Sequence, residues 1–167
     1  ILLAADAIYR PHTPAMLTTP MAALGLRAGQ YSLFVGTVEP RKNVKRLLEA
    51  YASLPANLRS EFPLVVAGGP GWNSAETHAL IAESVHAGWL HYLSYVDQRL
   101  LPALYAGARM MVYPSIYEGF GLPIVEAMAS GTPVLTSNIS CMPEVAAGAA
   151  RLVNPLDTEE ISHGITQ

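Results

Sequence analysis

The stretch YSLFVGTVEPRKNVKRLLEAY, residues 31–51, contains the unit from which the fold can be predicted. It starts with a continuous apolar run, passes through a glycine-containing turn, and continues with apolar residues spaced i, i+3, i+4 and i+7 from Val44 to Tyr51. A continuous apolar run is typical of a strand covered on both faces, and the second spacing is typical of an amphipathic helix. The stretch therefore predicts a buried β-strand followed by a helix.

The same alternation continues to the end of the chain. Further apolar runs recur, and segments with helical patterns separate them. The runs that predict strands are Tyr31–Val35, Leu64–Ala67, Leu90–Ser94, Met110–Tyr113, Pro133–Thr136 and Ala150–Val153. Strands that alternate with helices in this way form parallel sheets covered by helices. We therefore predict an α/β fold, a Rossmann-like parallel sheet of about six strands with helices on both faces.

The helices between these strands have predictable limits. Short polar side chains at a helix start accept hydrogen bonds from its first N–H groups, and glycine often follows a helix end. The apolar segment Leu122–Ser130 predicts a helix that Gly131 ends. The residues expected to cap helix starts are Asn43, Asn73 (in a capping box with Glu76), Asp97, and Asp157 or Thr158.

Length and composition describe one domain with few charges. Of the 167 residues 14% are charged, against about 25% in typical soluble domains, and the net charge is −3. Without a basic stripe, nucleic acid is not an expected partner. The single Cys141 excludes an internal disulfide, and we expect a reducing, cytoplasmic location. Residues 1–28 show little periodicity and predict a linker segment, whereas residues 29–167 form the domain, with its last helix cut short.

Polar and glycine-rich residues follow the predicted strands, at the sheet edge where ligands bind in such folds. Arg41 and Lys42 lie just before a helix N-terminus, whose N–H groups and dipole favour an anion such as a diphosphate. A solvated basic turn is the alternative interpretation. Neither a P-loop lysine motif nor G-x-G-x-x-G follows the first strand, so a simple NTPase or an NAD enzyme lacks its signature.

Two carboxylates form the second candidate feature. Glu118 lies in a loop at a strand end, and Glu126 is the only charged side chain of the helix that follows. A carboxylate on a buried helix costs free energy unless a partner binds it. Ligand hydroxyls, such as those of a ribose, are one such partner, and backbone N–H groups of a neighbouring loop are the alternative. Gly119 and Gly121 let backbone amides approach a ligand closely, or else only shape a turn.

The segment EGFGLPIVE, Glu118–Glu126, resembles the E-x7-E motif of the retaining family 4 glycosyltransferases. Residues 113–115 and 126–134 are also similar to that family, and residues 35–43 resemble its mannosyltransferase-like members. The resemblance extends from about Tyr31 to Asp157. It implies the C-terminal, donor-binding half of a two-domain GT-B enzyme. That enzyme would transfer a hexose, with retention, from GDP-mannose or a UDP-hexose to a saccharide or lipid-linked saccharide.

The resemblance also implies roles for individual residues. Lys42 matches the lysine that contacts the donor diphosphate, and Glu118 matches the glutamate near the transferred sugar, so these two are the expected catalytic residues. The family's partner arginine follows the glycine, but this chain has Thr37 after Gly36, so Arg41 is the expected substitute. Gly36 and Thr37 are themselves expected to contact the donor. The other implied contacts are Glu126 with the ribose, Tyr95 and Val96 with the base, Leu122 packed near the nucleotide, and the N–H groups of Gly119, Phe120 and Gly121 with sugar hydroxyls and phosphate.

Partners and alternatives follow from the same resemblance. No Asp-x-Asp metal motif is present, so we expect no metal and no cofactor besides the nucleotide sugar. An N-terminal GT-B domain would supply the acceptor site and any peripheral membrane association. The 167-residue chain alone is then expected to be inactive in transfer. A non-catalytic nucleotide-sugar-binding module and a nucleotide-sugar epimerase are the alternatives, although an epimerase should lack the E-x7-E block.

Overall fold

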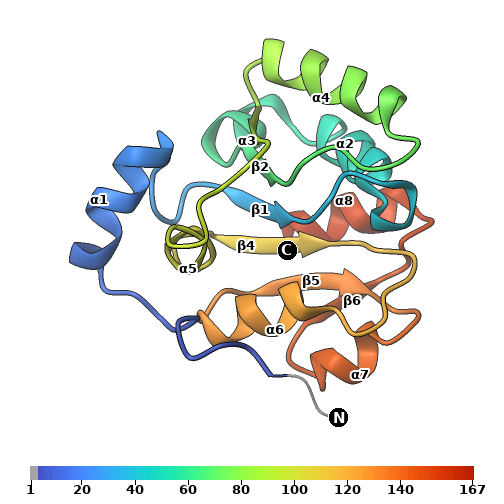
Figure 1. Cartoon of the computed structure of the whole chain (residues 1–167). Coiled ribbons are helices and arrows are strands. Elements are labelled where there is room, and N and C mark those ends of the chain that lie inside the picture. Colours follow the sequence, from blue (N-terminus) through green and yellow to red (C-terminus); the bar gives the residue numbers. More distant parts are fainter. Residues whose placement is uncertain (1–3) are drawn as a thin grey trace.

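The computed structural model describes residues 4–167 and shows strands and helices in alternation (Figure 1). The strands are β1 Ser32–Val35, β2 Leu64–Ala67, β3 Leu90–Leu93, β4 Met110–Tyr113, β5 Val134–Ser137 and β6 Arg151–Val153. The helices are α1 Pro14–Leu24, α2 Val44–Ala52, α3 Ala56–Glu61, α4 Ala75–His86, α5 Leu101–Ala106, α6 Leu122–Ala129, α7 Met142–Ala146 and α8 Thr158–Thr166. A short 3-10 helix, Pro40–Lys42, precedes α2.

The strands form one parallel sheet in the order β3-β2-β1-β4-β5-β6. In register, Ser32 of β1 lies beside Leu64 of β2 on one side and Met110 of β4 on the other. This is the doubly wound Rossmann order, in which the direction of strand addition reverses between β1 and β4. The predicted fold class is confirmed, and each predicted strand is present, with its limits shifted by no more than one residue.

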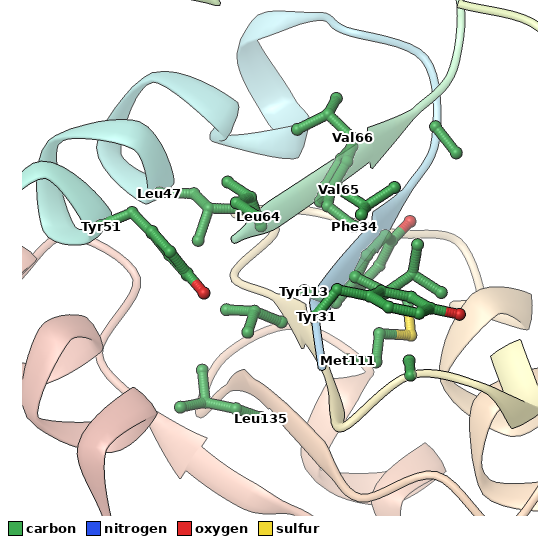
Figure 2. Packing of buried hydrophobic residues seen from close by; sticks show 14 of the residues in the cluster. Tyr31, Phe34, Leu47, Tyr51, Leu64, Val65, Val66, Met111, Tyr113 and Leu135 are labelled. Atoms are coloured by element: carbon green, nitrogen blue, oxygen red, sulfur yellow. The ribbon is translucent and has the colours of Figure 1, made fainter. Parts of the chain in front are cut away.

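The helices cover the sheet in two groups. Contacts join α1, α5, α6 and α7 into one layer and α2, α4 and α8 into another. Figure 2 shows how the core is built: Leu47 and Tyr51 reach from α2 toward the side chains of the sheet, where Leu33 and Leu64 are fully buried. Because strand side chains point to alternate faces, a sheet buried on both sides needs the continuous apolar runs found in the sequence.

Asn43 does not cap α2, contrary to the prediction. Its backbone is left-handed, with φ 60°, and its side chain makes no capping bond to the helix. Instead the amide group donates to the carbonyl oxygens of Pro114 (3.0 Å) and Pro155 (2.6 Å). Asn43 therefore fastens the turn after β1 to the segments that follow β4 and β6, which no local pattern indicates.

The predicted capping box before α4 is also wrong. Asn73 is left-handed, with φ 47°, and the residue at the cap position is Ser74, whose side chain makes no capping bond. Glu76 does not reach back to the backbone but pairs with Lys45 of α2 at 2.6 Å. The side chain of Glu76, which the local pattern assigned to a capping box, thus forms a tertiary ion pair instead.

Of the other predicted limits, one was wrong and two are confirmed. Asp97 binds its near neighbour Arg99, and α5 starts only at Leu101. Asp157 caps α8, because its carboxylate accepts from the second and third N–H groups of the helix at 3.0 Å. Gly131, left-handed with φ 78°, follows the end of α6 as expected.

The segment before residue 29, expected to be a linker, contains the helix α1, which the sequence analysis did not predict. Thr13 caps α1 through the N–H group of Met16, and left-handed Gly25 closes the helix. Leu17 and Met21 are buried, and α1 packs against α5. Residues 1–3 lie outside the described residues. For α1, Thr13-Pro14 at its start and Gly25 at its end were signals in the sequence. The short helices α3 and α7 have no start and stop signals as clear as these. No helix within residues 4–167 is both long and apolar enough to cross a membrane.

Candidate active site

The turn after β1 and the loop after β4 meet at the switch point of the sheet. β1 and β4 are neighbours, so their carboxyl ends open toward the same crevice. The N–H group of Ile116 donates to the carbonyl oxygen of Arg41 at 2.8 Å, and Asn43 adds its bond to Pro114. One backbone hydrogen bond and one bond from the Asn43 side chain thus hold together two loops distant in sequence, and their charged side chains share one site.

Glu118 is the centre of this site. Its buried carboxylate accepts hydrogen bonds from Lys42 (2.7 Å), Arg41 (2.8 Å), Tyr113 (2.8 Å) and Ser115 (2.7 Å). Burial alone would raise the pKa of Glu118, but the hydrogen bonds from Lys42, Ser115 and Tyr113 outweigh it and lower the pKa. Glu118 is therefore a carboxylate at neutral pH. The structure brings together three residues that the sequence had placed in two separate candidate features.

The two cations differ in exposure. The side chain of Lys42 is 9% exposed, and its ammonium also lies 5.0 Å from the centre of the Tyr113 ring. The side chain of Arg41 is 41% exposed and binds both Glu118 and Glu39, the latter at 2.5 Å. Both cations are thus paired with carboxylates of the protein. An incoming anion would compete with Glu118 and Glu39 rather than meet uncompensated positive charge.

The backbone of Glu118 is held by the loop after β5. The hydroxyl of Ser140 accepts from the N–H group of Glu118 (3.3 Å) and donates to its carbonyl oxygen (3.2 Å). Cys141, a free and half-buried thiol, donates to the same carbonyl oxygen at 3.3 Å. Ser140 has φ 60°, a conformation that costs non-glycine residues free energy and is enriched at functional sites. The sequence indicated no role for Ser140, Tyr113 or Ser115, because their partners are distant or depend on the loop's conformation.

The start of α6 presents backbone donors at the same edge. Gly121, left-handed with φ 87°, occupies the cap position and offers no side chain to the helix. Within residues 4–167, the N–H groups of Gly119, Phe120 and Gly121 have no protein acceptor. Such groups, together with the helix dipole, favour a phosphate or a ring of hydroxyls. Leu122, the first residue of α6, is 40% exposed beside them.

Glu126 belongs to a separate part of the site. No hydrogen bond or ion pair joins it to the Glu118 cluster; its carboxylate accepts a hydrogen bond from the Tyr105 hydroxyl of α5 at 2.8 Å. Burial raises the pKa of Glu126, and the hydroxyls of Tyr105 and Tyr9 act in the opposite direction. The alternative in which loop N–H groups bind this carboxylate is not what the structure shows. The hydrogen-bond partner is the hydroxyl of Tyr105, which the sequence analysis did not identify.

The remaining predicted residues lie on the same edge without joining either cluster. Gly36 (φ 151°) and the exposed Thr37 follow β1. Tyr95, which is 83% exposed, and the half-buried Val96 follow β3, and β2 separates β3 from β1. Large apolar side chains are also exposed on loops at this edge, namely Trp72, Tyr95, Tyr117 and Ile139.

A parallel sheet of this order, with two cations and a carboxylate at its switch point, defines a Rossmann-like domain with a charged site at its carboxyl edge. The chain belongs to the family described as "Glycosyl transferases group 1", whose sequence profile matches residues 25–167. The family resemblance and the fold class predicted from the residues are thereby confirmed. The narrower placement in the retaining family 4 stays a prediction.

Known proteins similar to this chain are longer. "O-antigen chain mannosyltransferase B" of Escherichia coli is 44% identical over 99% of this chain and 43% of its own length. The structure of sucrose-phosphate synthase from Thermosynechococcus elongatus superimposes with a TM-score of 0.78 at 27% identity, over 98% of this chain and 41% of that one. That of Anabaena Alr3699/HepE, solved with UDP-glucose, superimposes with a TM-score of 0.77 at 20% identity, over 95% and 44%. The chain thus spans less than half the length of each of these three proteins.

Proposed function

We propose that this domain binds the nucleotide sugar donor of a retaining glycosyltransferase. The observation that carries the proposal is the meeting of Arg41, Lys42 and Glu118 at the switch point, beside the free N–H groups at the start of α6. Such a constellation offers cations and backbone donors to a diphosphate, and a carboxylate to sugar hydroxyls. Membership in the glycosyl transferases group 1 family supports the same function.

In the proposed reaction the protein stabilises the departing diphosphate. Negative charge develops on it as the bond to the sugar breaks, and positioned cations and N–H groups are most effective against charge that develops in the transition state. Lys42 and Arg41 would exchange part of their bonding to Glu118 for bonds to phosphate oxygens. Arg41 already lies beside Lys42 on the same carboxylate, which supports its substitution for the arginine that Thr37 replaces.

The nucleoside would lie along the same edge. Glu126 has carboxylate lone pairs beyond the one that Tyr105 engages, and these suit two ribose hydroxyls. Tyr95 and Val96 would contact the base, and the exposed Leu122 would pack near the nucleotide. In this proposal the base would lie near the loop after β3, the ribose near Glu126, and the diphosphate and sugar near Arg41, Lys42 and Glu118.

The transferred sugar is proposed to be mannose from GDP-mannose, ahead of a UDP-hexose, because the E. coli relative is a mannosyltransferase. The acceptor, a saccharide or lipid-linked saccharide, would bind mainly to an N-terminal domain across the crevice. The exposed Trp72 and Tyr117, 64% exposed each, support a second protein surface there. A non-catalytic sugar-nucleotide module is the second candidate. The family match to glycosyl transferases rather than epimerases disfavours the epimerase alternative.

The test is a thermal-shift series on this chain with GDP-mannose, UDP-glucose, GDP and UDP, each in EDTA. We expect a ligand at about 100 times its dissociation constant to add about 2.7 kcal/mol of stability. For a domain of this size that raises the melting temperature by roughly 5–10 °C. A shift that occurs only after manganese is added would contradict the metal-independent site, and the absence of any shift would contradict the proposed function.

A further inference from the structure

The carboxylate of Glu126 has few polar partners for a charged group on a buried helix face. Within residues 4–167 no lysine or arginine forms an ion pair with it, and its direct hydrogen bond is the one from Tyr105. A carboxylate has two oxygens and about four sites for hydrogen bonds. One hydroxyl on Oε2 therefore leaves most of this capacity available, while it restrains the orientation of the carboxylate.

Tyr105 is itself held in place. Its side chain is fully buried, and its ring packs edge-on against the ring of Tyr9, with centroids 5.5 Å apart and an interplanar angle of 84°. Its carbonyl oxygen accepts a hydrogen bond from Thr132 at 2.6 Å, which ties the end of α5 to the turn after α6. Burial, and next the charge of Glu126, raises the pKa of Tyr105 well above 10. The hydroxyl therefore stays protonated and donates its hydrogen bond to Glu126.

Tyr9 comes from the segment before α1, which lies beside α6 (Figure 1). Close packing of this segment is seen at Pro11, since a Cβ placed on Gly131 would lie 3.3 Å from its Cγ. Burial, and then the charges of Glu126 and Asp6, raise the pKa of Tyr9 to about 12. The second tyrosine hydroxyl therefore also lies within the electrostatic field of Glu126.

We propose that Tyr105 positions Glu126 for the donor ribose, and that Tyr9 brings the segment before α1 into the same site. The inference rests on the proposed function only in its reference to ribose. A carboxylate that is already oriented loses less freedom when it binds hydroxyls, and this increases affinity. A segment predicted from the sequence as a linker is thereby assigned a role in donor binding.

The titratable groups around α6 allow a specific test. Tyr105 from α5 and Tyr9 from the N-terminal segment act on Glu126. Tyr113 of β4 is bonded to Glu118 instead, and Glu144 of α7 is exposed. Both tyrosine hydroxyls favour the ionised form of Glu126, so removing either one should raise its pKa. A merely structural tyrosine would change the melting temperature without this effect.

The experiment compares Tyr105→Phe and Tyr9→Phe with Tyr51→Phe, a control whose buried hydroxyl bonds to Ser32 on the other side of the sheet. Carbon-13 NMR of labelled glutamates follows the titration of Glu126, which is assigned by its loss in Glu126→Gln. We expect the Glu126 pKa to rise in Tyr105→Phe, to rise less in Tyr9→Phe, and to stay unchanged in the control.

Calorimetry with GDP and with inorganic pyrophosphate tests the role in binding. Tyr105→Phe should weaken GDP about ten-fold, the loss of one hydrogen bond to a charged group, and leave pyrophosphate unchanged. An unchanged Glu126 pKa in Tyr105→Phe would overturn the positioning role. A raised pKa with unchanged GDP affinity would overturn the link to ribose, and wild-type behaviour of Tyr9→Phe would overturn the role of the N-terminal segment. If wild type binds neither ligand, the proposed function fails while the titration still decides the positioning.

Discussion

Replacing Gly68 with alanine is expected to remove at least about 4 kcal/mol from the free energy of unfolding. A Cβ at Gly68 would lie 1.9 Å from the carbonyl oxygen of Gly36, and φ is 154°. Neither backbone can move away easily, because the N–H group of Gly36 donates to Ala67 and that of Gly68 donates to Leu93, both at 2.9 Å. For a domain of this size the melting temperature should fall by roughly 8–16 °C.

The adjacent Gly69 provides a matched control. A Cβ at Gly69 would meet nothing closer than the carbonyl oxygen of Ser94 at 3.8 Å, and its φ is not positive. Gly69→Ala should therefore change the unfolding free energy by less than about 1 kcal/mol in either direction. Thermal melts of the two variants decide the matter. Equal stability of Gly68→Ala and Gly69→Ala would show that the loops after β1 and β2 do not approach as closely as described.

Glu118→Gln is expected to destabilise the domain by about 3 kcal/mol, because it leaves the buried ammonium of Lys42 without a carboxylate. Lys42→Met should cost less, since Glu118 keeps its bonds from Arg41, Tyr113 and Ser115. The double variant should be less destabilised than the sum of the two single variants. Urea unfolding of all four proteins gives the coupling energy, which we expect to be about 1–3 kcal/mol.

The pair Lys45–Glu76 is the control for this cycle. Its charged atoms are 2.6 Å apart, as close as those of the buried pair, but the side chains are 45% and 74% exposed. Exposed pairs contribute little, so its coupling energy should stay below about 1 kcal/mol. Similar couplings in the two pairs would mean that Lys42 and Glu118 are not the buried, interdependent pair described above.

The pH dependence of the unfolding free energy is a second test of the role of Glu118. The pKa of Glu118 is lowered from its ordinary value of 4.5, so its contribution to stability is present in full above that value. The contribution decreases as the pH falls from 4.5 through the lowered pKa, because the unfolded state then binds a proton that the folded state does not. The stability advantage of wild type over Glu118→Gln should therefore be constant near neutral pH and decrease only below about pH 4.5.

Helix caps were the least successful part of the sequence-based predictions. Asn43, Asn73 and Asp97 are all short polar residues next to helices, and none of them caps one. Asn43 has two carbonyl partners from other loops, and Asp97 has a charged neighbour. Asp157 does cap α8, and within residues 4–167 its side chain makes no other hydrogen bond. For Asn43 and Asp97, another partner of the side chain therefore overrides cap propensity.

The sequence by itself determined the alternation of strands and helices, and it located Arg41, Lys42 and Glu118 in the loops that follow two strands. Apolar periodicity is a local property, since burial on both faces of a strand or one face of a helix must appear in consecutive residues. The E-x7-E block from Glu118 to Glu126 and the basic pair Arg41 and Lys42 are likewise contiguous in the chain.

Only the tertiary structure decided which of these residues meet. Lys42 and Arg41 reach Glu118 because β1 and β4 are neighbours, although two strands follow β1 in sequence before β4. Glu126 meets Tyr105 and lies in the field of Tyr9 because α5 and the segment before α1 pack beside α6. Strand order and helix packing result from the summed burial of the whole domain, so no local pattern of residues records them.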